Sequence, residues 1–268
     1  MRRSRITAYV ASLLLAVGGA LTGAAAAQAS PTAAATGYVA LGDSYSSGVG
    51  ADSYISSSGD CLRSTKSYPY LWAAAHSPSS FAFTACSGAR TGDVLAGQLG
   101  PLNSSTGLVS ISIGGNDAGF ADVMTTCVLN SDSGCLSRIA TAKAYVDSTL
   151  PGQLDSVYSA ISARAPAAHV VVLGYPRFYK LGATCLGLSD TKRAAINGAA
   201  DYLDSAIAKR AADHGFTFGD VRTTFTGHEL CSGSAWLHSL NLLNITESYH
   251  PTAAGHSGGY LPVFTGVA

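Results

Sequence analysis

The fold of this 268-residue chain is decided near its N-terminus by one stretch, Tyr38-Val39-Ala40-Leu41-Gly42-Asp43-Ser44-Tyr45. Its first four residues are apolar, and the run is as short as a buried strand. The glycine permits a sharp turn, and only small or flexible residues follow over 46–50. We therefore expect a strand over 38–41 that turns directly into a helix, with the hydroxyl of Ser44 exposed at the turn.

Four more short runs rich in strand-forming residues cover 81–84, 108–113, 169–173 and 216–218. Between them, apolar residues recur at helical spacing, for example over 154–161 and over 196–207, where Gly215 is expected to close the helix. Pro151 should divide 136–165 into two helices, because proline inside a helix removes a hydrogen bond. Strands that alternate with helices predict an α/β fold with an open, doubly wound, mostly parallel sheet. Functional sites in such sheets form outside the carboxyl ends of the strands.

Residues 1–29 have the pattern of a secretory signal peptide. Three arginines at positions 2, 3 and 5 precede an apolar run over 8–21, and small residues follow, with an Ala-x-Ala site at 27–29. The apolar run is too short to be a membrane span. We expect cleavage after Ala29, a single domain over 30–268, and an extracellular, secreted protein.

The charge and the cysteines of the remaining chain agree with export. Removal of 1–29 leaves 13 basic and 16 acidic residues, a net charge of about −3 that argues against nucleic acid as a partner. All six cysteines lie beyond residue 29, and an even number in an oxidising compartment favours three disulfides. Six cysteines allow fifteen pairings. Loop closure favours neighbours in the sequence, which are Cys61–Cys86, Cys127–Cys135 and Cys185–Cys231. No cysteine spacing or His-Glu-x-x-His motif suggests a metal site.

Four residues follow strand ends or lie near the C-terminus in a pattern typical of a serine hydrolase. A serine nucleophile needs a base, and His250 is the candidate for Ser44. The oxyanion formed on a substrate needs hydrogen-bond donors. Gly88 can offer its backbone N–H without a side chain in the way, and Asn116 can donate from its amide. With the N–H of Ser44, these groups would form a three-donor oxyanion hole. Taken singly, Gly88 fits a turn and Asn116 a helix cap.

The short segments around Ser44, Gly88, Asn116 and His250 together resemble the SGNH, or GDSL, hydrolase superfamily, and in particular its secreted actinomycete lipases and esterases. The resemblance covers essentially all of the chain beyond the signal peptide. It implies a flavodoxin-like three-layer α/β/α sandwich with about five parallel strands, and an enzyme that needs no cofactor. It also implies that Ser44, Gly88, Asn116 and His250 are the four residues after which the superfamily is named. Sequential disulfides fit the actinomycete branch.

One position departs from the common pattern of this superfamily. An aspartate usually stands three residues before the histidine and orients its ring, but Glu247 stands there in this chain. A backbone carbonyl performs this task in some similar enzymes. We expect the carbonyl of Ser248 to orient His250, with Glu247 as the alternative.

A second motif competes for the nucleophile. The stretch 255–259 has the form Gly-x-Ser-x-Gly, which would make Ser257 the nucleophile of an α/β-hydrolase elbow. That elbow requires a strand before the serine and a histidine after it. No histidine follows Ser257, and residues 251–255 are typical of the opening of a helix. The sequence therefore favours Ser44.

The resemblance implies a lipase or carboxylesterase that cleaves acyl esters of lipids through an acyl-enzyme on Ser44, with His250 as general base. Phospholipase A-type cleavage and acyl transfer to another alcohol are related activities. A polysaccharide acetylesterase is the alternative enzyme, and a secreted binding module without activity is the alternative from another class. We expect a monomer that binds a lipid or a small ester and makes transient contact with lipid surfaces.

Overall fold

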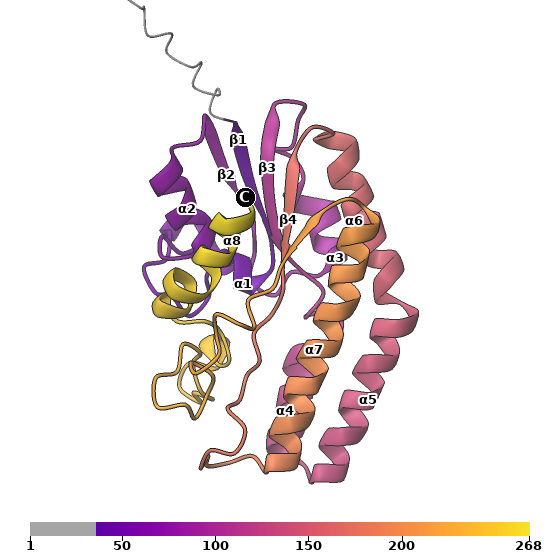
Figure 1. Cartoon of the computed structure of the whole chain (residues 1–268), viewed down its shortest axis with the longest axis vertical. Coiled ribbons are helices and arrows are strands. Elements are labelled where there is room, and N and C mark those ends of the chain that lie inside the picture. The colour runs from indigo at the N-terminus through magenta and orange to yellow at the C-terminus, as the bar shows by residue number, and fades with distance from the viewer. Residues whose placement is uncertain (1–35) are drawn as a thin grey trace, which may run out of the picture. The chain divides into compact units, whose positions relative to one another are not determined.

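All five strand-forming runs form strands in the computed structural model, which describes residues 36–268 (Figure 1). The strands are β1 (Gly37–Gly42), β2 (Ser80–Phe83), β3 (Thr106–Ser112), β4 (His169–Leu173) and β5 (Thr217–Gly219). Their order in the sheet is β2-β1-β3-β4-β5, and every pair is parallel. The expected signal peptide over 1–29 lies outside the described residues.

The helices are α1 (Ser44–Ser47), α2 (Tyr68–His76), α3 (Thr91–Asp93), α4 (Phe120–Leu129), α5 (Asp132–Ser148), α6 (Leu150–Arg164), α7 (Asp190–Asp213) and α8 (Leu261–Val267). Shorter or irregular turns are η1 (Ser56–Cys61), η2 (Val94–Gln98), η3 (Ile245–Glu247) and η4 (Gly255–Tyr260). Pro151 lies in the first turn of α6, and a break at Thr149 separates α6 from α5, so the predicted division is confirmed. Gly215 follows the end of α7 in the left-handed conformation, as expected of a closing glycine.

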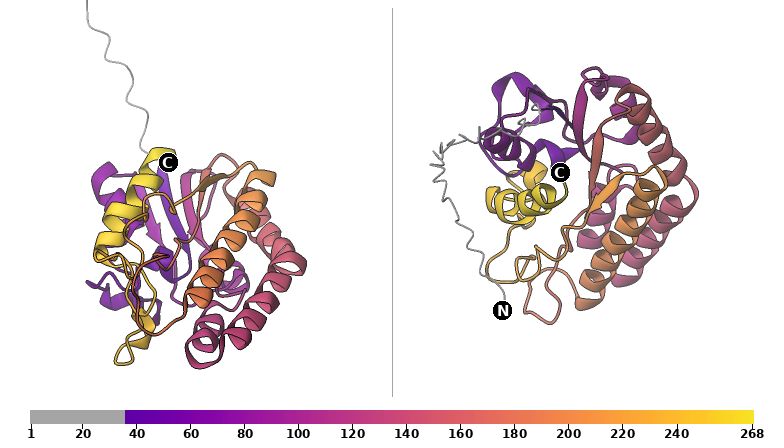
Figure 2. Two further views of the ribbon diagram at one scale, coloured as in Figure 1. Left: turned by 60° about the horizontal axis from the view of Figure 1, so that its bottom comes forward. Right: turned by 45° about the horizontal axis from the view of Figure 1, so that its top comes forward.

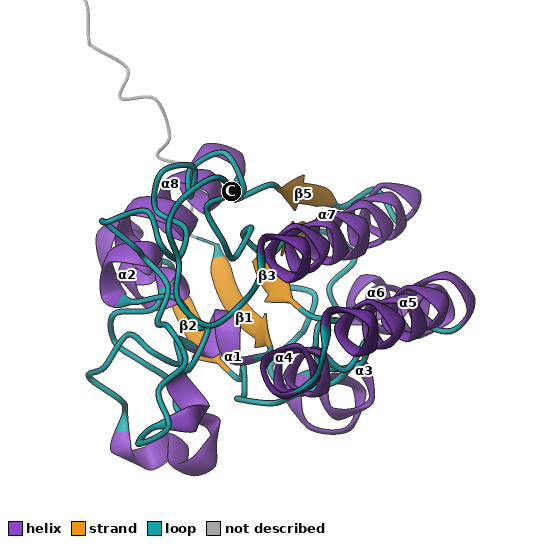
Figure 3. Cartoon of the chain, turned by 90° about the horizontal axis from the view of Figure 1, so that it is seen from below, coloured by secondary structure: helices purple, strands orange, loops and turns teal. Residues whose placement is uncertain are grey.

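The helices form layers on the two faces of the sheet (Figure 3). Helices α2 and α8 lie on one face, and α4 to α7 lie on the other, which the two views of Figure 2 also show. The predicted three-layer α/β/α sandwich is thereby confirmed. β1 is an internal strand between β2 and β3 and is fully buried, with Tyr38, Ala40 and Leu41 inaccessible to solvent. The chain turns from β1 to β2 on one side and then crosses to β3 on the other, so a crevice opens beyond the carboxyl ends of β1 and β3.

Three disulfides link the loops of this sandwich. Cys61 is bonded to Cys86, Cys127 to Cys135, and Cys185 to Cys231. These are the three sequential pairs that loop closure favours. The first ties η1 to the loop after β2, the second joins α4 to α5, and the third joins the loop before α7 to the loop after β5. Within residues 36–268, no helix has the length and apolarity needed to cross a bilayer.

Candidate active site

Ser44 lies at a sharp turn between β1 and α1. β1 ends at Gly42, whose φ is +120°, and a Cβ there would lie 2.4 Å from the carbonyl oxygen of Ser112, so only glycine fits. Asp43 caps α1, because its carboxylate accepts a hydrogen bond from the N–H of Tyr45 at 3.0 Å. Ser44 is the first residue of α1, as the strand-to-helix turn predicts, and it lines a cavity.

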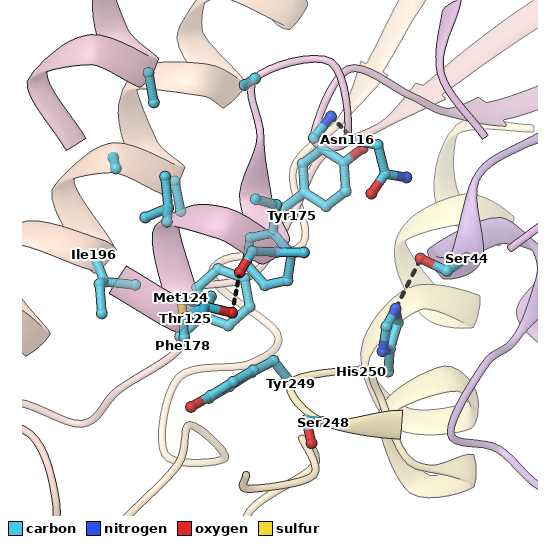
Figure 4. Close-up of a pocket in the computed structure, with 18 of the residues that line it drawn as sticks. Ser44, Asn116, Met124, Thr125, Tyr175, Phe178, Ile196, Ser248, Tyr249 and His250 are labelled. Atoms are coloured by element: carbon cyan, nitrogen blue, oxygen red, sulfur yellow. Dashed lines mark hydrogen bonds between the residues drawn. The ribbon is translucent and has the colours of Figure 1, made fainter. Parts of the chain in front are cut away.

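The structure brings His250 to Ser44 across 206 residues of sequence. The Nε2 atom of His250 lies 2.8 Å from Oγ of Ser44 (Figure 4). The hydroxyl of Tyr45 donates a hydrogen bond to the carbonyl of Tyr249 at 2.8 Å, which fastens the histidine loop to the serine turn. Burial lowers the pKa of His250 from 6.5 to about 4. The imidazole is therefore neutral at pH 7, and only the neutral form can accept a proton from serine.

The second ring nitrogen of His250 faces the backbone. Nδ1 makes no hydrogen bond of standard geometry with the residues that the structure describes. Burial lowers the pKa of this histidine, and the carbonyl of Ser248 is the strongest group that raises it, ahead of those of Thr246 and Glu247. The carboxylate of Glu247 points elsewhere and accepts a hydrogen bond from the hydroxyl of Tyr54 at 2.8 Å. This arrangement favours the Ser248 carbonyl over the Glu247 side chain as the group that orients the imidazole.

The expected oxyanion donors line the same cavity as Ser44 and His250. Gly88 has a φ of +75° in the loop after the Cys61–Cys86 disulfide, and the space where its Cβ would stand is open. The Nδ2 atom of Asn116 donates to the carbonyl of Ala89 at 3.0 Å, and one amide hydrogen is left for another acceptor. Among residues 36–268, the N–H groups of Ser44 and Gly88 have no acceptor. Three donors with a hydrogen left for another acceptor thus line one cavity.

A buried hydrogen-bond network supports the turn before Ser44. The carboxyl group of Asp43 accepts hydrogen bonds from the hydroxyls of Ser112, at 2.7 Å, and of Tyr175. The Tyr175 hydroxyl in turn accepts one from the N–H of Gly115 at 3.1 Å. Burial raises the pKa of Asp43 to about 6. Sequence reasoning missed Ser112 and Tyr175, because no local pattern distinguishes them from other strand and loop residues.

The cavity that begins at Ser44 has a volume of about 480 Å³ and mostly apolar walls. The walls come from α4, α5, α7 and the loops before α7 and before His250, and they include Phe120, Val123, Met124, Val146, Phe178, Ile196, Leu203 and Tyr249. Figure 4 shows several of these side chains on the side of the cavity away from Ser44 and His250. A space of this size and character accommodates a hydrocarbon chain next to a nucleophile.

The competing serine motif lies elsewhere. Ser257 belongs to η4, and its hydroxyl bonds to the carbonyl of Ala254 at 3.4 Å. It is absent from the residues of 36–268 that line the cavity. The neighbouring His256 is buried, and its Nδ1 accepts a hydrogen bond from the N–H of Tyr68 at 3.3 Å. No group of three or more His, Cys, Asp or Glu side chains within the described part of the chain is placed to hold a metal ion.

Comparisons with known proteins show the family to which the chain is similar. The sequence model of the GDSL-like lipase/acylhydrolase family matches residues 40–257. Lipase 1 of Streptomyces coelicolor is 79% identical over 268 residues, which is the whole of both chains. The crystal structure of phospholipase A1 from Streptomyces albidoflavus matches with a TM-score of 0.86 and 69% identity, covering 88% of this chain and 100% of that one. The crystal structure of an extracellular lipase from Streptomyces rimosus matches with a TM-score of 0.85 and 70% identity, covering 87% and 100%.

Proposed function

The chain belongs to the GDSL-like lipase/acylhydrolase family, and from that premise we propose that it cleaves acyl esters of lipids through an acyl-enzyme on Ser44. It is an ester hydrolase of the lipase type, like its close relatives. The observation that carries the proposal is the 2.8 Å contact between Nε2 of His250 and Oγ of Ser44 at an apolar cavity. Neither a polysaccharide acetylesterase nor an inactive binding module is favoured, because relatives at 69–79% identity are lipases or a phospholipase A1.

In the first half of the reaction, Ser44 forms a bond to the carbonyl carbon of the ester. Its hydroxyl proton passes to Nε2 of His250 as the bond forms. The carbonyl oxygen gains a negative charge and accepts hydrogen bonds from the N–H groups of Ser44 and Gly88 and from the amide of Asn116. The tetrahedral intermediate then collapses, the bond to the leaving oxygen breaks, and His250 returns the proton to that oxygen. The alcohol leaves and the acyl group stays on Ser44.

In the second half, water takes the place of the alcohol. His250 accepts a proton from the water as its oxygen attacks the acyl-enzyme, and the same three donors stabilise the second oxyanion. Collapse of this intermediate releases the carboxylic acid and returns the proton to Oγ of Ser44. During both halves the carbonyl of Ser248 favours the protonated imidazole and stabilises the positive charge on the ring.

Phospholipids are a second class of substrate for the same site. The relative from Streptomyces albidoflavus is a phospholipase A1, and 69% identity over its full length supports the same acyl-ester chemistry on a phospholipid in this chain. Transfer of the acyl group to another alcohol requires only that this alcohol replaces water in the second half of the reaction.

We further propose that the protein acts outside the cell as a monomer. One relative is described as an extracellular lipase, and three disulfides suit an oxidising environment. The N-terminal pattern of a signal peptide is the sequence feature that supports export.

A serine-directed organophosphate tests the nucleophile. Diethyl p-nitrophenyl phosphate should bind once per chain to the wild-type protein and abolish hydrolysis of a soluble p-nitrophenyl ester. The variant Ser44→Ala should neither react with the label nor turn over the ester, whereas the matched control Ser257→Ala should behave as the wild type does. Modification of Ser257, located by peptide mass spectrometry, would overturn the assignment. Parallel assays of acylglycerols, phosphatidylcholine and acetylated xylan identify the substrate class.

A further inference from the structure

An uncharged apolar loop lies next to the catalytic histidine. We call residues 239–246 the mouth loop; its sequence, Ser-Leu-Asn-Leu-Leu-Asn-Ile-Thr, contains no ionisable side chain. Leu242 is 82% exposed, Leu243 is 100% exposed and Ile245 is 61% exposed. Single exposed leucines are common on soluble proteins, but a continuous group of them marks an interaction site.

The mouth loop also borders the cavity that holds Ser44. Leu240, Leu242 and Ile245 line this cavity, and the loop ends four residues before His250. On another side, Leu129 at the C-terminal end of α4 lines the cavity and is 75% exposed. The loops that follow β5 and the lower end of α4 both lie in the lower part of the molecule in Figure 1. Exposed leucines from two separate elements therefore border the cavity that holds Ser44.

Hydrogen bonds of Asn241 fix the backbone conformation of the mouth loop. The N–H of Asn241 donates to the hydroxyl of Ser248 at 2.9 Å, and the side chain of Asn241 accepts a hydrogen bond from the N–H of Leu243 at 3.0 Å. Such a turn fixes the backbone without help from the side chains of Leu242 and Leu243. The apolar side chains are thus presented to the exterior by a defined loop conformation.

We propose that the mouth loop, together with Leu129, inserts into the surface of aggregated lipid and seats the cavity entrance on it. The inference rests on the proposed function, because a lipid ester in water is found in micelles, emulsions or bilayers. A loop without charged side chains loses less free energy of hydration on insertion than a charged loop would, and transfer of its leucines out of water is favourable. The acyl chain of a substrate can then pass from the lipid phase into the apolar cavity without crossing water.

Vesicles of a dialkyl-ether phosphatidylcholine test this docking separately from hydrolysis, because they contain no ester bond. The variant Leu243→Asp removes the fully exposed leucine, which does not line the cavity, and places a charge where insertion would occur. We expect its partitioning into the vesicles to be at least ~10-fold weaker than that of the wild type, a change that corresponds to about 1.4 kcal/mol. The matched control is Leu95→Asp, which changes a 38% exposed leucine of η2 that lies away from the cavity, and it should partition as the wild type does.

Hydrolysis of a soluble p-nitrophenyl ester by Leu243→Asp should stay at the wild-type rate. Equal partitioning of Leu243→Asp and the wild type, or no partitioning of the wild type, would refute the docking. A change of molecular mass in sedimentation equilibrium, without a change in partitioning, would instead assign the mouth loop to a second copy of the chain. Failure of Ser44 to react with the organophosphate would refute the proposed function but leave the vesicle result intact.

Discussion

The hydroxyl of Tyr175 donates a hydrogen bond to the carboxyl group of Asp43, the residue immediately before Ser44. The same hydroxyl accepts a hydrogen bond from the N–H of Gly115, the residue immediately before Asn116. One buried group thus joins the nucleophile turn to the turn that carries an oxyanion donor. Tyr175 acts through both neighbours and is a positioning residue.

The variant Tyr175→Phe should lower kcat by roughly 10- to 100-fold with little change in KM, because displacement of a catalytic group by about 1 Å costs on that order. Loss of the hydrogen bonds should also lower the free energy of unfolding by about 1–3 kcal/mol. Steady-state kinetics on a soluble ester and urea unfolding measure the two effects. Tyr202→Phe is the control, since the hydroxyl of Tyr202 bonds to Asp147 on an exposed surface. Lower stability with an unchanged kcat would limit Tyr175 to a role in folding.

The choice between Ser248 and Glu247 as the orienting group is tested by comparing two alanine variants. Glu247→Ala should keep kcat/KM within about tenfold of the wild type, because its carboxylate bonds to Tyr54 and not to the imidazole. His250→Ala should lose roughly 10³-fold or more, since the general base is gone. Equal inactivity of the two variants, with both folded by circular dichroism, would transfer the orienting role to Glu247.

The pH dependence of kcat/KM should reflect the buried histidine. Burial disfavours the charged imidazolium and lowers the pKa of His250 to about 4, so the base stays neutral well below pH 6.5. Activity on a soluble ester should hold down to about pH 5 and fall to half of its plateau near pH 4. Far-ultraviolet circular dichroism at each pH separates this loss from acid unfolding. A pH of half-maximal kcat/KM near 6.5 would show that the imidazole of His250 is far more exposed to water than it is in the structure.

The buried carboxyl group of Asp204 should make the protein less stable in alkali. Its Oδ1 accepts a hydrogen bond from the N–H of Tyr175 at 2.9 Å, its Oδ2 has no hydrogen-bond partner among the described residues, and Arg222 lies 3.7 Å away. Burial raises its pKa to about 8, so the folded protein holds a proton that the unfolded chain releases above about pH 4. The stability that this proton contributes is lost as pH rises toward 8.

The variant Asp204→Asn cannot ionise and keeps an acceptor for Tyr175. Its free energy of unfolding should therefore decline less between pH 5 and pH 9 than that of the wild type. Urea unfolding at several pH values gives both curves. Parallel curves would mean that Asp204 ionises in the folded protein as easily as in water.

The disulfides Cys61–Cys86 and Cys185–Cys231 should differ in their effect on catalysis. Cys61–Cys86 spans 25 residues and directly precedes Ser87 and Gly88, whereas Cys185–Cys231 spans 46 residues and belongs to loops before α7 and after β5. Replacement of either pair by alanine should cost roughly 3 kcal/mol or more of stability. Only the Cys61→Ala/Cys86→Ala protein should also lose kcat, because the Gly88 donor is no longer fixed. Equal kcat values at a temperature where both proteins are folded would contradict this.

The parts of the site that the sequence predicts are those with a local signature. The strand before Ser44 and the glycine before Asp43 each reflect a backbone requirement that neighbouring residues reveal. The network around Asp43 has no such signature, because Tyr175 reaches it across 132 residues. In the same way, Tyr54 binds Glu247 across 193 residues. The sequence therefore shows that Glu247 replaces the family's usual aspartate, but it does not show where the carboxylate of Glu247 binds.

The cavity walls also escape sequence reasoning. Met124 and Ile196 lie on different helices, and only the packing of α4 on α5 and of α5 on α7 brings them to one space. Apolar residues at helical spacing predict that a helix buries one face. The pattern does not say whether that face meets another helix or borders an open volume.

Helices α4 to α6 lie in one continuous segment between β3 and β4. Asn116 stands just before α4, whereas Ser44, Gly88 and His250 come from other parts of the chain. Part of the cavity wall is therefore encoded apart from the nucleophile and its base, while α7 and the loops before α7 and before His250 supply the rest of the wall. Exchange of residues 120–165 between related proteins would replace the wall from α4 and α5 and leave Ser44 and His250 in place. This division allows the walls of the cavity to change in sequence while the residues that carry out hydrolysis stay the same.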